Sequence, residues 1–195
     1  MENSTGKIRS FIAIELPVDM RNQFRILEEE LKNKLNIPAS WVKPENCHIT
    51  LKFLGNITGT NLPQITNALT AVTQDTPPFY LELDAPSAFP GTKHPRILWV
   101  GLRGDVPQLL SLHKRVDESL HRVGFIPEHR LFSPHLTLCR IRENLPAAIC
   151  NDIGNILTAV KIENNVRFKI VELTLFKSQL TPGGPVYTRL ITCRM

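Results

Sequence analysis

A short pattern of residues suited to proton transfer occurs twice in the chain, as His48-Ile-Thr-Leu51 and as His135-Leu-Thr-Leu138. In a β-strand, residues i and i+2 point to the same face, so each histidine shares a face with its threonine. If two such strands face each other, one imidazole can take a proton from an attacking hydroxyl or water while the other protonates the leaving oxygen. The two hydroxyls can donate hydrogen bonds to phosphate oxygens. The pattern therefore indicates acid–base chemistry on a phosphate.

Repetition is what gives the pattern its weight. The chain has six histidines, so one His-x-Thr is expected by chance, and a single copy is better interpreted as an ordinary strand histidine. Both copies here share the same leucine, follow a polar or proline-rich loop and precede a predicted helix. This favours two similar halves that each contribute one strand to a shared site. Two unrelated strand histidines remain the alternative.

The neighbours of the first motif have simple expectations. By alternation, Lys52 shares a face with His48 and Thr50, where it either attracts phosphate or lies solvated at the strand end. The residues expected to anchor the opposite faces of the two strands are Ile49, Leu51 and Phe53, and Leu136 and Leu138.

The elements that position the motifs are predicted from hydrophobic periodicity and turn residues. Strands are expected at Ile8–Glu15, Cys47–Leu54, Phe79–Leu83, Ile97–Leu102, Leu136–Ile141, once or twice within Val166–Leu180, and at Val186–Cys193. Helices are expected at Asp19–Asn36, Asn61–Thr73, Asp105–Val123 and Pro146–Val160, with Asp19 and Asp105 as N-caps. Ala85–Arg96, with three prolines and Gly91, is expected to be a loop. The alternation and the final hairpin predict an α+β fold with mixed or antiparallel sheets.

Composition narrows the class of protein. The 195 residues are 42% hydrophobic and 21% charged, which fits a folded domain and excludes a disordered chain or a large multidomain protein. No apolar run approaches the ~20 residues of a membrane-spanning helix. Phe11–Val18 lacks the features of an export signal, and the four cysteines form no CxxC pair, so a cytoplasmic location is expected. The net charge of +5 favours a polyanionic partner.

Other chemistries find less support. A zinc site built from Cys47, His48, His135 and Cys139 requires adjacent strand residues to converge, although they point to opposite faces. A Cys139 nucleophile lacks an acidic or amide partner to orient a histidine. The sequence contains no P-loop or GxGxxG. Three aromatic residues are candidates either for stacking a base or for packing, namely Trp41, Phe89 and Trp99.

In these motifs and their surroundings the chain resembles the 2H phosphoesterases, and in particular the RNA 2′,3′-cyclic phosphodiesterases, also called 2′-5′ RNA ligases. The blocks that carry the resemblance occur in the family's order and are Arg9-Ser-Phe-Ile-Ala-Ile-Glu-Leu-Pro17, Trp41-Val-Lys-Pro-Glu-Asn-Cys-His-Ile-Thr-Leu-Lys-Phe-Leu-Gly55, Phe89-Pro90, Pro95-Arg-Ile-Leu-Trp-Val-Gly-Leu102 and Phe132-Ser-Pro-His-Leu-Thr-Leu-Cys-Arg140. The resemblance implies one bilobal α+β domain over residues 1–195 with a pseudo-twofold axis. One motif would lie in each lobe, with the site between them, and neither a metal nor another cofactor would be needed.

Carried over by position, the resemblance implies His48 as proton donor, His135 as proton acceptor, and Thr50 and Thr137 as phosphate-holding hydroxyls. Arg140 resembles a further phosphate contact of the family. Strict alternation places Arg140 on the face opposite His135, so the strand must bulge or end by residue 139, or the guanidinium must reach around.

The implied activity is metal-independent hydrolysis of a 2′,3′-cyclic phosphate at an RNA end to a 2′-phosphate, with reversible 2′-5′ ligation when a 5′-hydroxyl replaces water. RNA with such an end would be the partner, with no membrane and no obligate protein partner. One alternative is action on a small nucleotide, such as ADP-ribose 1″,2″-cyclic phosphate or 2′-5′ oligoadenylate. Another is a non-catalytic module that binds a nucleotide or RNA end, although binding alone does not need two histidines of opposite protonation.

Overall fold

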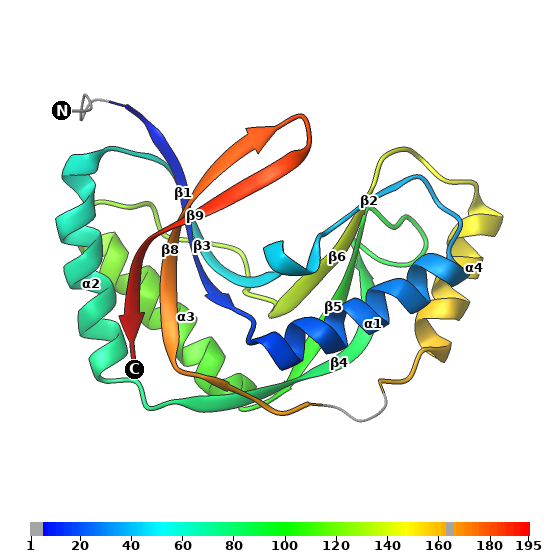
Figure 1. The fold of residues 1–195 in the computed structure, drawn as a ribbon, viewed down its shortest axis with the longest axis horizontal. Helices are drawn as coiled ribbons and strands as arrows, with labels where there is room; N and C mark the ends of the chain where they lie inside the picture. The colour runs from blue at the N-terminus through cyan, green and yellow to red at the C-terminus, as the bar shows by residue number, and fades with distance from the viewer. Residues whose placement is uncertain (1–5, 163–165) are drawn as a thin grey trace.

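The computed structural model describes residues 6–162 and 166–195. Its chain forms two antiparallel sheets, with helices packed on the outside of each (Figure 1). This arrangement confirms the α+β, bilobal fold class. None of the helices in the described part of the chain is long and apolar enough to cross a membrane.

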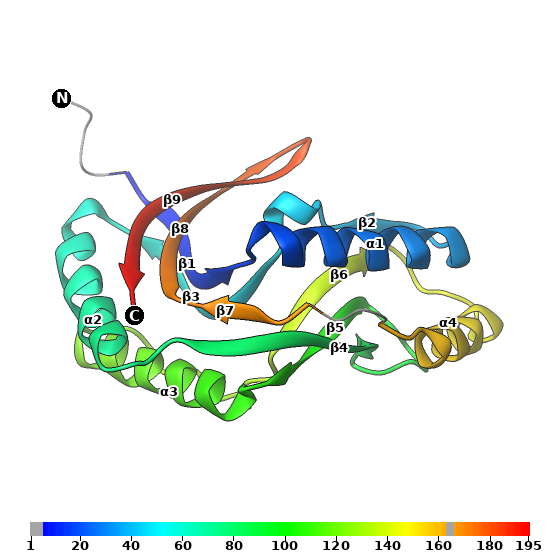
Figure 2. The ribbon, with the colours of Figure 1, turned by 60° about the horizontal axis from the view of Figure 1, so that its bottom comes forward.

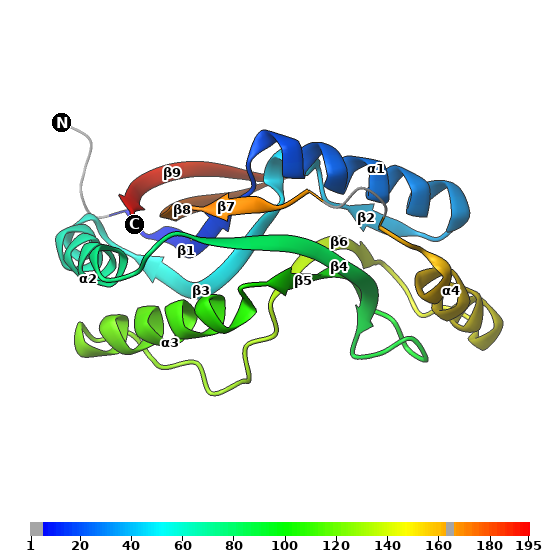
Figure 3. The ribbon, with the colours of Figure 1, turned by 90° about the horizontal axis from the view of Figure 1, so that it is seen from below.

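The first lobe is built on a four-stranded sheet in the order β3-β1-β8-β9. Its strands are β1 (Ile8–Glu15), β3 (His48–Ile57), β8 (Glu172–Thr181) and β9 (Gly184–Arg194). Two helices cover its outer face, α2 (Leu62–Gln74) and α3 (Val106–Arg122) (Figure 3). The stripe of α3 that packs inward is fully buried and consists of Leu109, Leu112, Val116 and Leu120.

The second lobe is built on a five-stranded sheet in the order β2-β6-β5-β4-β7. Its strands are β2 (Ala39–Trp41), β6 (His135–Ile141), β5 (Ile97–Gly104), β4 (Phe79–Phe89) and β7 (Phe168–Ile170). The helices α1 (Val18–Lys34) and α4 (Ala147–Ala159) lie in this lobe (Figure 2). Two short 3-10 helices flank β3 in the sequence, η1 (Pro44–Asn46) before it and η2 (Gly59–Asn61) after it.

The two halves of the sequence are interwoven. The four-stranded sheet takes β1 and β3 from the first half of the chain and β8 and β9 from the second, while α3 covers this sheet and α1 lies with the other. One hydrophobic cluster consequently runs through both lobes. The motif strands β3 and β6 therefore belong to different sheets over a common core.

Most predicted elements are present, with two corrections. Ala85–Arg96 is not wholly a loop, because β4 continues to Phe89 beyond a bulge, with Pro86 opposite Val100 on β5. Gly101 lies opposite the bulge, where an added Cβ would come within 3.3 Å of the Asp84 Cβ. The bulge depends on the pairing with β5, which the local sequence pattern does not show.

The second correction concerns the helix caps. Asp19 lies in the first turn of α1, and the N-cap residue is Pro17 instead. Asp105 is the N-cap residue of α3, as predicted, but its carboxylate accepts a hydrogen bond from the Tyr80 backbone N–H at 2.8 Å instead of capping the helix. This bond links the start of α3 to β4. The short strand β2 was not predicted, because three residues carry too little periodicity to be recognised.

Candidate active site

A bulge in β6 sets the direction of the second motif's side chains. In the pairing with β5, Thr137 lies opposite Trp99 and Cys139 opposite Leu98, which leaves Leu138 as an extra residue. Leu138 and Cys139 are both buried. Alternation resumes after the bulge, so Arg140 lies on the face of His135 and Thr137. The bulge thus explains how Arg140 shares a face with His135 although regular alternation places them on opposite faces.

The first motif contains the same irregularity. In the pairing of β3 with β1, Thr50 lies opposite Ala13 and Lys52 opposite Ile12, with Leu51 as the extra residue. Leu51 and Lys52 are both buried, and Phe53 turns to the face of the motif with 68% of its surface exposed. The prediction that Phe53 anchors the core is therefore wrong. Phe53 and Arg140 each stand five residues after their histidine, so they occupy equivalent places in the two halves.

Lys52 does not face the same side as His48, contrary to the prediction from alternation. Its ammonium forms an ion pair with Asp117 of α3 and donates a hydrogen bond to the Ile126 carbonyl at 2.8 Å. The Asp117 carboxylate also accepts the Glu128 backbone N–H at 3.1 Å. Although burial raises the pKa of Asp117, these hydrogen bonds outweigh it and hold the pKa below its ordinary value. Lys52 thus ties the segment that leads to His135 against β3 and α3.

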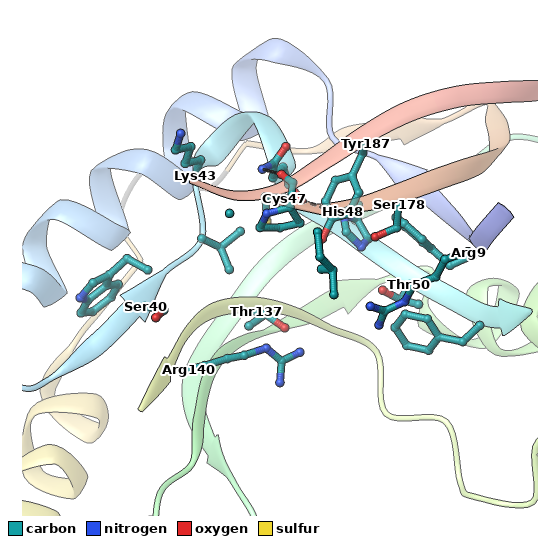
Figure 4. A pocket seen from close by; sticks show the side chains of 18 of the residues that line it. Arg9, Ser40, Lys43, Cys47, His48, Thr50, Thr137, Arg140, Ser178 and Tyr187 are labelled. Carbon is teal, nitrogen blue, oxygen red and sulfur yellow. Dashed lines mark hydrogen bonds between the residues drawn. The ribbon is translucent and has the colours of Figure 1, made fainter. Parts of the chain in front are cut away.

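All five predicted site residues line one cavity of about 620 Å³. Its walls come from β1, β3, β8 and β9 of the first lobe and from β2 and β6 of the second (Figure 4). The volume falls within the roughly 300–1,000 Å³ of small-molecule sites. The predicted residues in the wall are His48, Thr50, His135, Thr137 and Arg140. The wall also contains residues that the sequence did not single out as site residues, among them Arg9, Phe11, Lys43, Phe53 and Tyr187.

Both histidines are held in the same way. Nδ1 of His48 lies 2.7 Å from the Asn46 carbonyl oxygen, and Nδ1 of His135 lies 2.7 Å from the Ser133 carbonyl oxygen. A carbonyl oxygen only accepts, so each Nδ1 carries the proton of that bond. Nε2 of each ring is then the atom available to take or give a proton. The repeated bond orients two imidazoles identically in the two halves.

His48 lies in an aromatic setting. Its ring is 4.8 Å from the Phe11 ring and 5.3 Å from the Tyr187 ring, which meets it edge-on. Burial lowers the pKa of His48 below its ordinary value, although the hydrogen bond to Asn46 and the nearby Glu15 carboxylate oppose this shift. The free protein therefore favours the neutral imidazole at this position.

His135 packs against two aromatic residues that were candidates for stacking a base. Its ring meets the Phe89 ring edge-on at 5.1 Å and lies 6.0 Å from Trp99. Phe89 and Trp99 are themselves stacked at 4.8 Å, so both serve as packing behind the histidine. Trp41 lines the cavity, and the Lys32 ammonium lies 5.4 Å from its ring.

The two cysteines beside the motifs are both buried, although Cys47 also belongs to the cavity lining. Cys139 of β6 is fully buried, and burial raises the pKa of its thiol to about 12. Burial raises the pKa of the Cys47 thiol as well. Among the residues that the structure describes, no three or more His, Cys, Asp or Glu side chains gather as a metal site. A cysteine nucleophile and a cysteine–histidine zinc site therefore find no support in this geometry.

The cavity lining carries positive charge. It includes the cationic side chains of Arg9, Lys43 and Arg140, and among residues 6–162 and 166–195 it contains no aspartate or glutamate. Glu15, the acidic residue that acts on His48, forms an ion pair with Arg189 at 2.6 Å and is not part of the lining. Two imidazoles, two hydroxyls and three cations thus surround a space suited to an anion.

Comparison with known proteins finds phosphoesterases that match nearly the whole chain. The family model described as LigT like Phosphoesterase matches the chain twice, over residues 14–99 and 100–187, so each match contains one His-x-Thr strand. An RNA 2′,3′-cyclic phosphodiesterase of Methanothermobacter thermautotrophicus is 29% identical over 97% of this chain and 100% of its own. A protein of the same name from Archaeoglobus fulgidus is 31% identical over 94% of this chain and 98% of its own.

Solved structures share the fold. The crystal structure of Escherichia coli LigT complexed with 3′-AMP has a TM-score of 0.76 and 25% identity, covering 97% of this chain and 99% of that one. A Thermus thermophilus protein has a TM-score of 0.77 at 22% identity, covering 96% of this chain and 97% of that one. With both halves matched by the family model and the fold shared along nearly its whole length, the chain belongs to the LigT-like phosphoesterase family.

Proposed function

We propose that the protein hydrolyses the 2′,3′-cyclic phosphate at the 3′ end of RNA and leaves a 2′-phosphate and a free 3′-hydroxyl, without a metal ion. The observation that carries this proposal is the pair of identically anchored imidazoles, each beside a threonine hydroxyl, in one cationic cavity. Curated relatives named RNA 2′,3′-cyclic phosphodiesterase, matched along nearly their whole length, support the choice of substrate.

The proposed roles are those implied by the family resemblance. Nε2 of His135 takes a proton from water as the water oxygen bonds to phosphorus, and Nε2 of His48 gives a proton to O3′ as the P–O3′ bond breaks. Each ring ends in the opposite protonation state, and proton exchange with solvent resets both. The non-bridging oxygens receive hydrogen bonds from Thr50, Thr137 and Arg140 as negative charge builds in the five-coordinate transition state.

Substrate binding favours the protonated form of His48 that the proposed acid role requires. Burial favours neutral His48 in the free protein, whereas the proposed role needs an imidazolium. A bound phosphodiester anion stabilises the charged ring and raises its pKa. Protonated His48 is therefore formed together with the complex.

An aromatic wall supports a nucleotide as the substrate. Phe53 presents an exposed phenyl ring to the cavity, five residues after His48. Stacking of a base on an aromatic side chain contributes about 1–3 kcal/mol. The second half offers the Arg140 guanidinium at the equivalent place, so the two halves differ in what they offer the substrate.

Ligation is the same displacement at phosphorus with a different nucleophile. A 5′-hydroxyl in place of water, acting with a 2′,3′-cyclic end, gives a 2′-5′ linkage without nucleotide hydrolysis. The alternative substrates, ADP-ribose 1″,2″-cyclic phosphate and 2′-5′ oligoadenylate, would use the same residues. A binding module would use the cavity without turnover.

The test is hydrolysis of an oligonucleotide that ends in a 2′,3′-cyclic phosphate. The product is analysed to determine whether the phosphate is on the 2′ or the 3′ oxygen. His48→Ala and His135→Ala should each lower turnover at least ~100-fold. His94→Ala, an exposed histidine of the loop before β5, should retain normal turnover and serves as the matched control. Thorough chelation should leave the rate unchanged. Binding without turnover by the unsubstituted protein, or faster turnover of the small cyclic nucleotides, would replace this proposal with one of the alternatives.

A further inference from the structure

The cavity carries more positive charge than one reacting phosphate requires. A cyclic phosphodiester has a single negative charge, and Arg140 with the two threonine hydroxyls already faces it. Two further cations, Arg9 and Lys43, line the same cavity, and neither forms a salt bridge within residues 6–162 and 166–195. The unused charge indicates a second anionic group on the substrate.

Arg9 lies on the first-lobe wall, further along the sheet than the first motif. In the pairing of β1 with β3, Thr50 lies opposite Ala13, Phe53 lies opposite Phe11, and Asn56 lies opposite Arg9. Along the sheet, Phe53 with its exposed phenyl ring therefore lies between Thr50, which faces the reacting phosphate, and the backbone of Arg9. Figure 4 shows Arg9 on the Thr50 side of His48, and Arg140 beside Thr137 of the other lobe.

The Tyr187 hydroxyl lies within the field of both arginines. Tyr187 reaches the cavity from β9 with its ring edge-on to His48. Burial raises the pKa of Tyr187, while the positive charges of Arg140 and Arg9 act in the opposite direction. A phenol hydroxyl donates well to phosphate oxygens. Arg9 and Tyr187 thus bring a charged donor and a neutral donor into one part of the cavity.

Lys43 differs from Arg9 in its direction. It precedes η1, and Figure 4 shows its ammonium pointing away from the two histidines. It adds to the overall field of the cavity, whereas Arg9 adds a donor on the side of the phenyl ring. The two residues therefore make a matched pair for separating a specific contact from general attraction.

We propose that Arg9, with the Tyr187 hydroxyl, binds a second phosphate of the substrate, the one esterified to the 5′ oxygen of the terminal nucleotide. This inference rests on the proposed function and specifies its substrate class. The protein would act on chain ends, or on nucleotides with a 5′-phosphate, in preference to nucleoside 2′,3′-cyclic phosphates. The Phe53 ring would then stack against the terminal nucleoside between the two phosphates.

The test compares adenosine 2′,3′-cyclic phosphate with the same compound carrying a 5′-phosphate. The ratio of their kcat/KM values should favour the 5′-phosphorylated compound by about tenfold or more, the effect expected of one charge-assisted hydrogen bond. Arg9→Gln should reduce this ratio to near one. Tyr187→Phe, which keeps the ring against His48, should reduce it partly. Lys43→Gln removes the same charge from the cavity and should preserve the ratio.

Equal kcat/KM values for the two compounds with the unsubstituted protein would overturn the inference and leave the proposed function standing. A ratio lost in Lys43→Gln and kept in Arg9→Gln would overturn the assignment to Arg9. Turnover of neither compound, nor of a cyclic-ended oligonucleotide, would instead contradict the proposed function, and the second phosphate site with it.

Discussion

His135 and Arg140 project from the same face of β6 although they stand five residues apart, a spacing that regular alternation assigns to opposite faces. The extra residue Leu138 reverses the alternation between them. The same bulge at Leu51 turns Phe53 to the face of His48 in the other half. Each half thus presents a histidine, a threonine and a third side chain to one cavity.

The first prediction follows from this bulge. Arg140→Ala should lower kcat/KM on cyclic-ended RNA roughly 10- to 100-fold, because it removes a charged hydrogen-bond donor from the phosphate. Arg142→Ala is the control, since Arg142 lies outside the cavity lining and donates to the Ser40 hydroxyl at 2.9 Å. Steady-state kinetics of the two variants make the comparison. Equal losses would mean that the facing of Arg140 has no functional consequence.

The second prediction concerns the exposed phenyl ring. Phe53→Ala should lower kcat/KM about 5-fold or more, because stacking on the terminal base is lost. The loss should disappear on a substrate whose terminal sugar carries no base. Leu131→Ala, which removes an almost fully exposed apolar side chain from the loop before β6, is the control and should show no loss. An undiminished loss on the abasic substrate would assign Phe53 a role in packing.

The third prediction concerns pH. Burial lowers the pKa of His48 in the free protein, so its protonated form is lost as the pH rises through a value below 6.5. The alkaline limb of kcat/KM, which reports the free protein, should therefore lie at lower pH than that of kcat, which reports the complex. The bound anion raises the pKa and moves the second limb upward. Coincident limbs, or the reverse order, would argue against His48 as the acid.

The fourth prediction concerns stability. Lys52→Met should lower the free energy of unfolding by about 3–5 kcal/mol, because it leaves the largely buried Asp117 carboxylate without its cationic partner. Lys34→Met breaks an exposed ion pair with Glu30 and should cost only about 0.3–0.5 kcal/mol. Urea unfolding measures both. Similar small losses in the two variants would show that the Lys52 pair does not hold the segment before β6.

Local sequence predicts the regular part of each motif well. His48 with Thr50, and His135 with Thr137, follow from spacing alone because the members of each pair are two positions apart. Prediction fails at the bulges, which depend on the pairing with β1 and β5. In the second motif the adjacent apolar residues Leu138 and Cys139 are a signal of a bulge, whereas in the first the charge of Lys52 hides it.

Some other cavity residues come from strands that only the sheet order brings to the motifs. Arg9 lies on β1, between β3 and β8, and Tyr187 lies on β9 at the far edge of the same sheet. Nothing in their local sequence distinguishes them from other strand residues. The length of β4 was missed for a similar reason, since Pro86 ends a strand in isolation but lies opposite Val100 here.

The measurement closest to the central claim, that two histidines act as acid and base on opposite sides of phosphorus, uses a substrate whose 3′ oxygen is replaced by sulfur. A thiolate leaves without a proton, so His48→Ala should regain much of its lost rate on this 2′,3′-cyclic phosphorothiolate, while His135→Ala should remain slow. Rescue of His135→Ala alone would exchange the two roles. Rescue of neither variant would contradict the account, because both histidines would then act only by holding the phosphate.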